Sequence, residues 1–574
     1  MSKPPKKRGQ RFLKRFSRVS EQTIIVGEEH VRENFLARLS HISDVRLFIL
    51  EWALIVVALF LLALAQSFWF TDSYTVSGFT SGGTYTEATL GKVNSLNPLF
   101  ASTNSEKTLA KLLFSGLTAS DSSGHVGNLL ARSVESSNGK TWTVKLRDGL
   151  KWSDGEPLTN SDVLFTVGLI QNPAVVSNYS STLNRVSVKE DKDGALVFEL
   201  PAVYAEFASA LDFPILPKHI LGNVEPSALL EAPFSSKPIS SGAFALNASQ
   251  SVGSSGETIV YLSANKNYFK GSPKINSFVV HAFMSTSDIK TALNSGAVSA
   301  TAELLPTDSK DISSKTVYEK QTKINSGVFL FLNARSSIFK DKSVRKAVQT
   351  GLNLDELRSL VGDEAPLDYP ILKSQISLDS WPELPSRDLE SSKSLVSGLE
   401  DKVVSIATIN TGYFPVLAED LASQLEEIGF TVNKEIYEPG QDFIVNVVAG
   451  RNYDLLLYEV ELGANPDLLV YYHSSQANQS GLNLSNYHNS VADSYILAAR
   501  ETADESEKNQ AYEAFLRRWI DDVPSIALFQ VNMSYYFDKN LKTFSEDNTL
   551  VVPTDRFADV RFWAVEKTSK NRTP

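Results

Sequence analysis

The sequence contains no cysteine in its 574 residues. This absence excludes disulfide bonds, thiolate nucleophiles, iron–sulfur clusters and zinc sites with thiolate ligands. It also excludes a membrane anchor built on a lipidated cysteine. Histidine is sparse, with seven residues, and none of them forms an HExxH or comparable pair that would indicate a transition-metal site. We therefore expect neither a metal nor a cofactor.

Motifs typical of enzymes are missing as well. The loop GSSGE at 253–257 does not match the GxSxG nucleophile elbow, and no GxxxxGK[ST] phosphate loop occurs. The sequence does not exclude a pair of carboxylates for glycoside hydrolysis, because their separation of about 5 to 10 Å is a tertiary feature. We expect a protein that is not an enzyme, and an anchored extracellular hydrolase is the alternative.

Charge is distributed unevenly along the chain. Residues 1–46 contain eleven Lys or Arg and five Asp or Glu, whereas the whole chain has a net charge of -11. The part beyond residue 46 is therefore strongly acidic, which argues against nucleic-acid binding. Between them, LFILEWALIVVALFLLALAQSFWF at 47–70 has Glu51 as its sole charge and exceeds the ~20 residues that cross a bilayer.

This pattern predicts one transmembrane helix over 47–70. A basic tail over 1–46 favours the cytoplasmic side, so the main domain is extracellular or periplasmic. The alternative is a cleaved signal peptide, because Ala63-Leu64-Ala65 is a small-x-small site ahead of Gln66. The long basic region before the span favours a retained helix. In both cases the main domain is exported.

The sequence of the exported part alternates between strand-like and helix-like segments, as is typical of an α/β protein. Residues 71–82 are rich in Ser, Thr and Gly and are predicted to be a linker. Later, VVSIATIN (403–410) reads as a buried strand, FPVLAEDLASQLEEIGF (414–430) as a helix and TVNKEIY (431–437) as a strand. Such βαβ units form open sheets that bind ligands at the carboxyl ends of their strands.

The acid-rich stretch LRDGLKWSDGEPLTNSDV (146–163) is predicted to be structural. It lacks the ligand ladder of an EF-hand calcium loop. Asp154-Gly155 is a tight-turn dipeptide, and Thr159 with Asp162 three residues later matches a helix capping box. These acids are therefore interpreted as turn and cap residues.

The string GLKWSDGEPLTNSDVLFT (149–166) resembles the signature of the extracellular solute-binding proteins of family 5, the oligopeptide- and dipeptide-binding proteins of ABC transporters. Further segments are similar to this family in the same order, among them LNPLF (96–100), ILPKHIL (215–221) and FLFLNARSSIFKDKSVRKAVQTGLNLDEL (329–357). The similarity spans 83–563.

The resemblance implies a two-lobed α/β clamp of the periplasmic-binding-protein kind, type II, with an extra subdomain in lobe one. Lobe one would be 83–332 and 528–574, with the subdomain near 106–205, and lobe two would be 333–527. The lobes would close over a peptide or similar small solute and present it to an ABC permease. The protein would act as a monomer. A further alternative is a ligand-sensing receptor module, in which residues 1–46 would transmit the closure of the lobes as a signal.

The resemblance also implies ligand contacts. In peptide-binding relatives a tryptophan and an acidic residue three positions later meet the ligand, and the acid pairs with its amino terminus. Tyr458 and Glu461 match these positions, with Asp467 as an alternative acid.

From lobe one, Ser102-Thr103-Asn104 matches a segment that lines the cleft, although Ser102 replaces an acid of the family pattern. Tyr413, Phe529 and Gln530 are further candidate ligand contacts.

Overall fold

The computed structural model describes residues 42–571, except 122–123, 181, 184, 254–255, 363–364, 439–442, 480 and 546–549. The chain forms two compact units, residues 1–78 with 567–574 and residues 79–566. Most of the predicted cytoplasmic tail lies outside the described residues. The ligand-binding residues predicted above all belong to the second unit.

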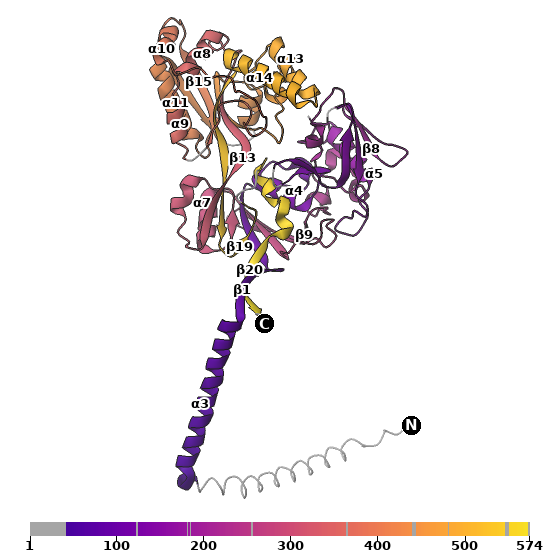
Figure 1. Cartoon of the computed structure of the whole chain (residues 1–574), viewed down its shortest axis with the longest axis vertical. Coiled ribbons are helices and arrows are strands. Elements are labelled where there is room, and N and C mark those ends of the chain that lie inside the picture. The colour runs from indigo at the N-terminus through magenta and orange to yellow at the C-terminus, as the bar shows by residue number, and fades with distance from the viewer. Residues whose placement is uncertain are drawn as a thin grey trace, which may run out of the picture. The chain divides into compact units, whose positions relative to one another are not determined.

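The first unit contains the predicted membrane span. Helix α3 (Ile42–Tyr74) covers it, and large apolar side chains are exposed on this helix from Phe48 to Leu64 (Figure 1). Within the described residues, no helix is both long and apolar enough to cross a membrane. The helix is present, but the structure does not confirm it as a transmembrane span. Beyond it, the predicted linker includes β1 (Thr75–Thr80).

An eleven-stranded sheet is the framework of the second unit. Its order is β16-β15-β17-β13-β18-β12-β2-β11-β10-β9, and β14 pairs with β18 beside this path. The strands are β2 (Thr84–Leu90), β9 (Phe244–Val252), β10 (Glu257–Ala264), β11 (Ser277–Phe283), β12 (Ala300–Thr301), β13 (Val317–Leu332), β14 (Ala365–Pro366), β15 (Val403–Ile409), β16 (Thr431–Tyr437), β17 (Leu455–Glu461) and β18 (Ser525–Asp538).

Two long antiparallel strands, β13 and β18, lie in the middle of this sheet and connect its two halves. Residues 317–323 of β13 pair with 532–538 of β18, and 327–331 pair with 525–530, so the register shifts between Lys323 and Gly327. Strand β17 pairs with β13 at 326–332, and β12 pairs with β18 at 536–537. The shift therefore separates a β17 half, containing β15–β17, from a β2 half, containing β2 and β9–β12. The lobe boundaries inferred from the family stay predictions.

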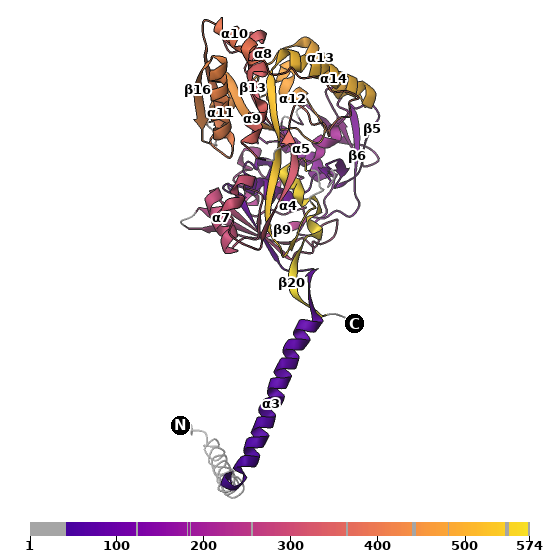
Figure 2. The same cartoon turned by 60° about the vertical axis from the view of Figure 1, so that its left-hand side comes forward.

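Helices cover both halves of the sheet. In the β17 half, α11 packs on β15 and β16, α10 packs on α8, and α13 packs on α14. Figure 2 shows α10 and α11 beside β16, with α13 and α14 on the other side of β13. The helices are α4 (Asn104–Leu113), α5 (Asn160–Gln171), α6 (Lys218–Leu221), α7 (Thr286–Ser295), α8 (Lys342–Gly351), α9 (Leu354–Ser359), α10 (Leu389–Ser397), α11 (Phe414–Ile428), α12 (Leu469–Tyr472), α13 (Ser490–Glu501) and α14 (Glu505–Asp522).

Smaller elements complete the unit. A four-stranded sheet has the order β5-β6-β8-β7, and β3 pairs with β4. These strands are β3 (Thr118–Ser120), β4 (Val126–Asn128), β5 (Ala131–Ser136), β6 (Thr141–Leu146), β7 (Ser187–Glu190) and β8 (Leu196–Glu199), and the last two strands of the chain are β19 (Leu541–Lys542) and β20 (Ala564–Asn571). Short helical turns are η2 (Pro98–Phe100), η3 (Phe207–Leu211), η4 (Pro226–Ala228), η5 (Pro233–Ser235), η6 (Pro306–Asp311), η7 (Phe443–Ala449), η8 (Ser474–Gln476) and η9 (Pro553–Phe562).

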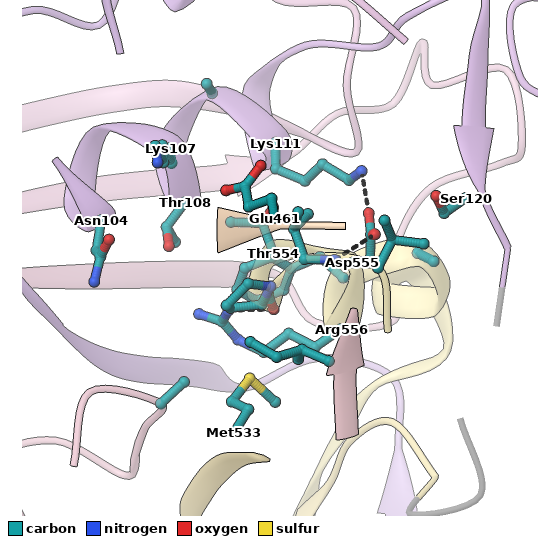
Figure 3. A pocket seen from close by; sticks show the side chains of 18 of the residues that line it. Asn104, Lys107, Thr108, Lys111, Ser120, Glu461, Met533, Thr554, Asp555 and Arg556 are labelled. Carbon is teal, nitrogen blue, oxygen red and sulfur yellow. Dashed lines mark hydrogen bonds and ion pairs between the residues drawn. The ribbon is translucent and has the colours of Figure 1, made fainter. Parts of the chain in front are cut away.

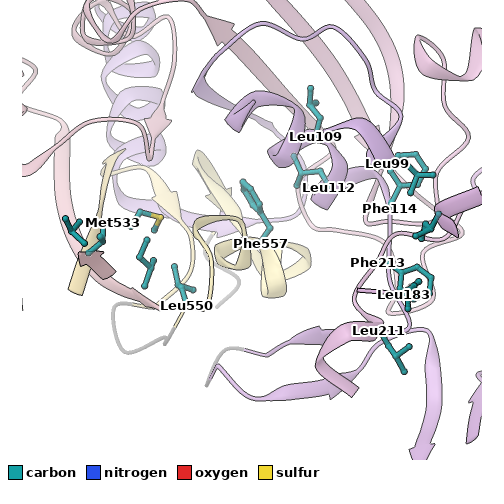
Figure 4. Packing of buried hydrophobic residues seen from close by; sticks show 14 of the residues in the cluster. Leu99, Leu109, Leu112, Phe114, Leu183, Leu211, Phe213, Met533, Leu550 and Phe557 are labelled. Atoms are coloured by element: carbon teal, nitrogen blue, oxygen red, sulfur yellow. The ribbon is translucent and has the colours of Figure 1, made fainter. Parts of the chain in front are cut away.

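The core of the β2 half is continuous over segments far apart in the sequence. Leu109 and Leu112 of α4, Phe213 after η3 and Phe557 of η9 are all buried in one apolar cluster (Figure 4). Burial of such side chains stabilises the fold by about 1.5 to 3 kcal/mol each. The packing holds α4 and η9 in place, and both elements line the site described below.

The acid-rich stretch at 146–163 is structural, as predicted. Gly155 has a φ of 99° in a turn closed by the Trp152 amide, which donates to the carbonyl of Glu156 at 2.8 Å. The buried Asp162 carboxylate accepts hydrogen bonds from the amides of Thr159 (2.8 Å) and Lys218 (2.9 Å). It therefore caps α5 and also fixes the chain that enters α6.

We expect Asp162→Ala to lower the free energy of unfolding by about 2 to 3 kcal/mol, because two amides lose a charged acceptor. Denaturant unfolding measures this change. Glu156→Ala, at an exposed position of the same stretch, is the control, with an expected change within about 0.5 kcal/mol. Equal effects of the two substitutions would contradict the structural role of Asp162.

Candidate functional site

A cavity of about 1060 Å³ lies in the second unit. This volume is slightly above the range of about 300 to 1,000 Å³ that is usual for ligand pockets. Helix α4, η9 and the residue after η3 contribute from the β2 half, and β17 and the start of α11 contribute from the β17 half. Residues of β13 and β18 at the register shift, including Ser326 and Asn532, also line it. Figure 3 shows Lys107, Lys111 and Glu461 among its lining side chains.

The loop before α4 is organised by the buried carboxylate of Glu106. This carboxylate accepts hydrogen bonds from the amides of Asn94 (2.8 Å), Ser102 (2.9 Å) and Thr103 (3.2 Å). The Ser102 hydroxyl also donates to it at 3.0 Å. Glu106 and the Thr103 side chain form a capping box at the start of α4. The loop is therefore held rigid by a residue that the sequence did not single out.

The three predicted contacts in this loop differ in position. Ser102 and Asn104 line the cavity, whereas Thr103 is absent from the residues that line it. The Thr103 hydroxyl caps α4 and donates to the Lys92 carbonyl at 3.0 Å. The Asn104 amide donates to Glu303 at 2.7 Å. Asn104 and Glu303 therefore form one polar wall of the cavity.

Strand β17 brings two carboxylates to the cavity. Side chains alternate between the faces of a strand, so Glu459 and Glu461 share a face, and both line the cavity. Burial raises the pKa of Glu459 to about 7, hydrogen bonds from Ser326 and Tyr413 lower it, and the charge of Glu461 raises it. The Glu461 side chain is exposed to the cavity.

The same alternation places Tyr458 on the opposite face of β17. Its ring packs with a second apolar cluster, with its centroid 6.0 Å from that of Phe443. Burial raises the pKa of Tyr458, and the carboxylates of Glu459 and Glu461 raise it further. Tyr458 is not among the residues that line the described cavity, and its role in ligand binding stays a prediction.

The three further predicted contacts, Tyr413, Phe529 and Gln530, have partners within the protein. Phe529 is fully buried and packs edge-on against Tyr413, with ring centroids 5.3 Å apart. The Gln530 side chain donates to the Ile324 carbonyl at 2.9 Å. Of these three, only Tyr413 lines the described cavity. Phe529 and Gln530 support the wall, and their contact with a ligand stays a prediction.

Asp467 pairs with Arg500 at 3.3 Å. The Arg500 guanidinium lies over the Tyr204 ring, 3.9 Å from its centroid. Asp467 is not among the residues that line the described cavity. As the alternative acid for a ligand ammonium group it stays a prediction, whereas Glu461 lines the cavity.

Two ion pairs neutralise part of the charge of the cavity. Lys111 on α4 pairs with the buried Asp555 of η9 at 2.7 Å (Figure 3). The buried Arg556 guanidinium donates to Glu87 through its Nε at 3.1 Å. Burial disfavours the charge of Lys111, but Asp555 more than compensates and the pKa of Lys111 is raised. The Arg556–Glu87 pair is buried on both sides, and removal of one partner from such a pair costs about 3 to 5 kcal/mol.

Acidic groups outnumber basic groups among the described residues that line the cavity. The carboxylates are those of Asp121, Asp212, Glu303, Glu459, Glu461, Asp555 and Asp559, and the cations are Lys107, Lys111, Lys270 and Arg556. The sequence analysis identified only Glu461 among them. Its neighbour Glu459 was detectable from the two-residue period of the strand YEVE. The other groups come from separate segments, so no local pattern announces them.

Comparison with known proteins identifies the family. The profile of the bacterial extracellular solute-binding proteins, family 5, matches residues 125–481. The chain belongs to this family. It is 27% identical over 492 residues to the oligopeptide-binding protein AppA of Bacillus subtilis (strain 168), covering 81% of this chain and 89% of that protein. It is 25% identical over 435 residues to protein XP55 of Streptomyces lividans, covering 71% and 77% of the two chains.

Solved structures show the same mixed α/β fold. AppA from Bacillus subtilis, in complex with a nonapeptide, matches with a TM-score of 0.71 at 24% identity, over 85% of this chain and 100% of that chain. NikZ from Campylobacter jejuni, in complex with Ni(L-His), matches with a TM-score of 0.71 at 21% identity, over 84% and 99%. The predicted α/β solute-binding fold of the main body is thus confirmed.

The raised pKa of Glu459 predicts a pH dependence of stability. The folded protein binds the Glu459 proton more tightly than the unfolded chain does between pH 4.5 and about 7. The stability from this group is therefore present at low pH and is lost as the pH rises through this window.

We expect Glu459→Gln to remove this loss, so that its melting temperature rises relative to that of the unmodified protein between pH 5 and pH 8. Calorimetry of both proteins over this range measures the difference. Glu435→Gln, on β16 and outside the described cavity lining, is the control. A difference that does not change with pH would contradict the burial of the Glu459 charge.

Proposed function

We propose that this protein is the solute-binding component of an ABC transporter, and that it captures a peptide in the cavity and presents it to a permease for uptake. The observation that carries the proposal is the position of Glu461. Its carboxylate comes from the β17 half and lines the same cavity as α4 of the β2 half. A ligand between them would contact both halves, which is how a clamp couples binding to closure.

The proposed ligand contact is a charge-assisted hydrogen bond. A free peptide amino terminus is an ammonium group, and Glu461 presents a carboxylate to the cavity. No side-chain hydrogen bond or ion pair occupies the Glu461 carboxylate among the described residues. Relatives named as oligopeptide-binding or peptide-binding proteins support a peptide as the ligand.

Contacts away from the cavity support a clamp that closes. Glu206 of the predicted lobe one accepts from Lys508 at 2.8 Å and from Asn465 at 2.9 Å, and both residues belong to the predicted lobe two. The Ala205 amide donates to the Arg500 carbonyl at 3.1 Å. These exchangeable polar contacts suit an interface that opens and closes better than a large apolar one would.

We expect Glu461→Gln to weaken the binding of peptides with a free amino terminus by about tenfold or more, because a hydrogen bond to a charged group contributes about 1.5 to 3 kcal/mol. Isothermal titration calorimetry with a peptide library measures the affinities. Amino-terminally acetylated peptides are the control, since they lack the ammonium group and their binding should change by less than about twofold. Equal losses for both kinds of peptide would remove Glu461 from the ammonium site.

We propose in addition that the protein is tethered to the membrane by its amino-terminal segment, with residues 1–46 in the cytoplasm. Support comes from the exposed apolar side chains along α3, such as Trp52, Leu59 and Phe60, and from the basic residues that precede them. Apolar side chains of this kind are stable in the hydrocarbon core of a bilayer.

We expect the full-length protein to stay in the membrane pellet after extraction with alkaline carbonate. An epitope tag at the amino terminus should remain on the pelleted protein, because the helix is retained. A known exported soluble protein serves as the release control. Loss of the tag with release into the supernatant would instead identify the segment as a cleaved signal peptide.

A further inference from the structure

One end of the cavity holds more negative charge than its own cations neutralise. Asp212, Glu461, Asp555 and Lys111 all line the cavity, and the charges of the last three act on Asp212. Lys111 is the cation of this group, and its ammonium is already paired with Asp555 at 2.7 Å. Among the described residues at this end, two carboxylates are therefore left without an ion-pair partner, Glu461 and Asp212.

Asp212 is held in place by its backbone. It follows η3, where the Leu211 carbonyl accepts from the Leu117 amide at 3.0 Å. A Cβ atom at Gly116 would lie 2.4 Å from the Asp212 carbonyl oxygen, so only glycine allows this approach. The backbone of Asp212 is thus pinned against the segment that follows α4. Its side chain starts from a rigid support, which favours a binding role over a mobile one.

The Asp212 carboxylate has no ion-pair partner among the described residues, and its one hydrogen bond comes from its own backbone amide. It takes part in no ion pair and in no hydrogen bond to another described residue, yet it lines the cavity. Burial raises its pKa to about 6, Lys111 lowers it, and Asp555 and Glu461 raise it. The Asp212 side chain is exposed and lines the cavity, so a positively charged group of a ligand can reach it without breaking an existing ion pair. Its complement is a positive charge supplied from outside the chain.

We propose that Asp212 binds a basic side chain of the ligand, so that the cavity selects peptides carrying Lys or Arg over neutral peptides of the same shape. This inference rests on the proposed function, in which Glu461 holds the amino terminus. It adds a second charged contact at a different residue. Two unpaired carboxylates at one end of the cavity would then be matched by two positive charges of one ligand.

Tyr179 completes the surroundings of this contact. It lines the cavity, and burial, followed by the charges of Asp212 and Glu461, raises its pKa. Tyr179 therefore stays neutral, and it lines the same cavity as Asp212. Aromatic rings attract ammonium and guanidinium groups and pack against the methylene stems of Lys and Arg. The pair suits a long basic side chain better than a compact cation.

The test compares lysine with norleucine, which has the same four-carbon stem without the charge. Tetrapeptides of alanine with one lysine at each position in turn, and their norleucine counterparts, are titrated into the full-length protein by calorimetry. The readout is the ratio of the norleucine to the lysine dissociation constant at the best position. We expect a ratio of about ten or more, as for a charge-assisted contact, and a fall of about tenfold in Asp212→Asn.

Two further variants make the result specific. Asp148→Asn removes a charge at an exposed residue outside the cavity and should keep the original ratio. Asp212→Glu keeps the charge and should keep a ratio well above one. Circular dichroism checks that Asp212→Asn is folded.

The possible outcomes distinguish this inference from the proposed function. A ratio near one for the unmodified protein, with peptides still bound, overturns the inference and leaves peptide binding standing. The same holds if Asp212→Asn weakens both peptide series equally. Failure of every peptide to bind overturns the proposed function and the inference together.

Discussion

The pairing of β13 with β18 is the interaction on which the rest of the second unit depends. These strands connect the β17 half of the sheet to the β2 half, and every other strand of the large sheet joins through one of them. Their ladder is interrupted between Lys323 and Gly327. A continuous ladder would fill this region with backbone hydrogen bonds. Ser326 and Asn532 flank the interruption and line the cavity, so the site lies where the ladder between the two strands is broken.

The charged groups in and around the cavity are of two kinds: those held in ion pairs within the protein, and those without an ion-pair partner that a ligand can contact. Asp555 and Glu87 are buried and matched by Lys111 and Arg556, which anchors η9 to α4 and to β2. Such matched pairs tolerate burial because the partner replaces the lost water. The carboxylates of Asp212 and Glu461 lack an ion-pair partner among the described residues and are exposed to the cavity. A cation that binds them in the folded protein stabilises the fold.

Local structure was predictable from the sequence where the interacting groups are close in the chain. The turn at Asp154-Gly155 and the cap at Asp162 form between residues at most four apart, and both were predicted correctly. The additional contact from Asp162 to the Lys218 amide was not predicted, because it joins residues 56 positions apart. Strand β17 is an intermediate case. Its two-residue period already places Tyr458 on the opposite face from Glu459 and Glu461, but that period does not show which face points to the cavity.

The sequence by itself determined the family, the α/β class and Glu461 as a candidate for ligand binding, because ordered motifs and periodicity survive without coordinates. Only the tertiary structure decided which carboxylates face one cavity and which of them are already paired. Asp212, Glu459 and Asp555 come from three distant segments, and each is an ordinary acid in its local context. Their roles depend on distances of a few ångströms across the fold, and packing sets these distances.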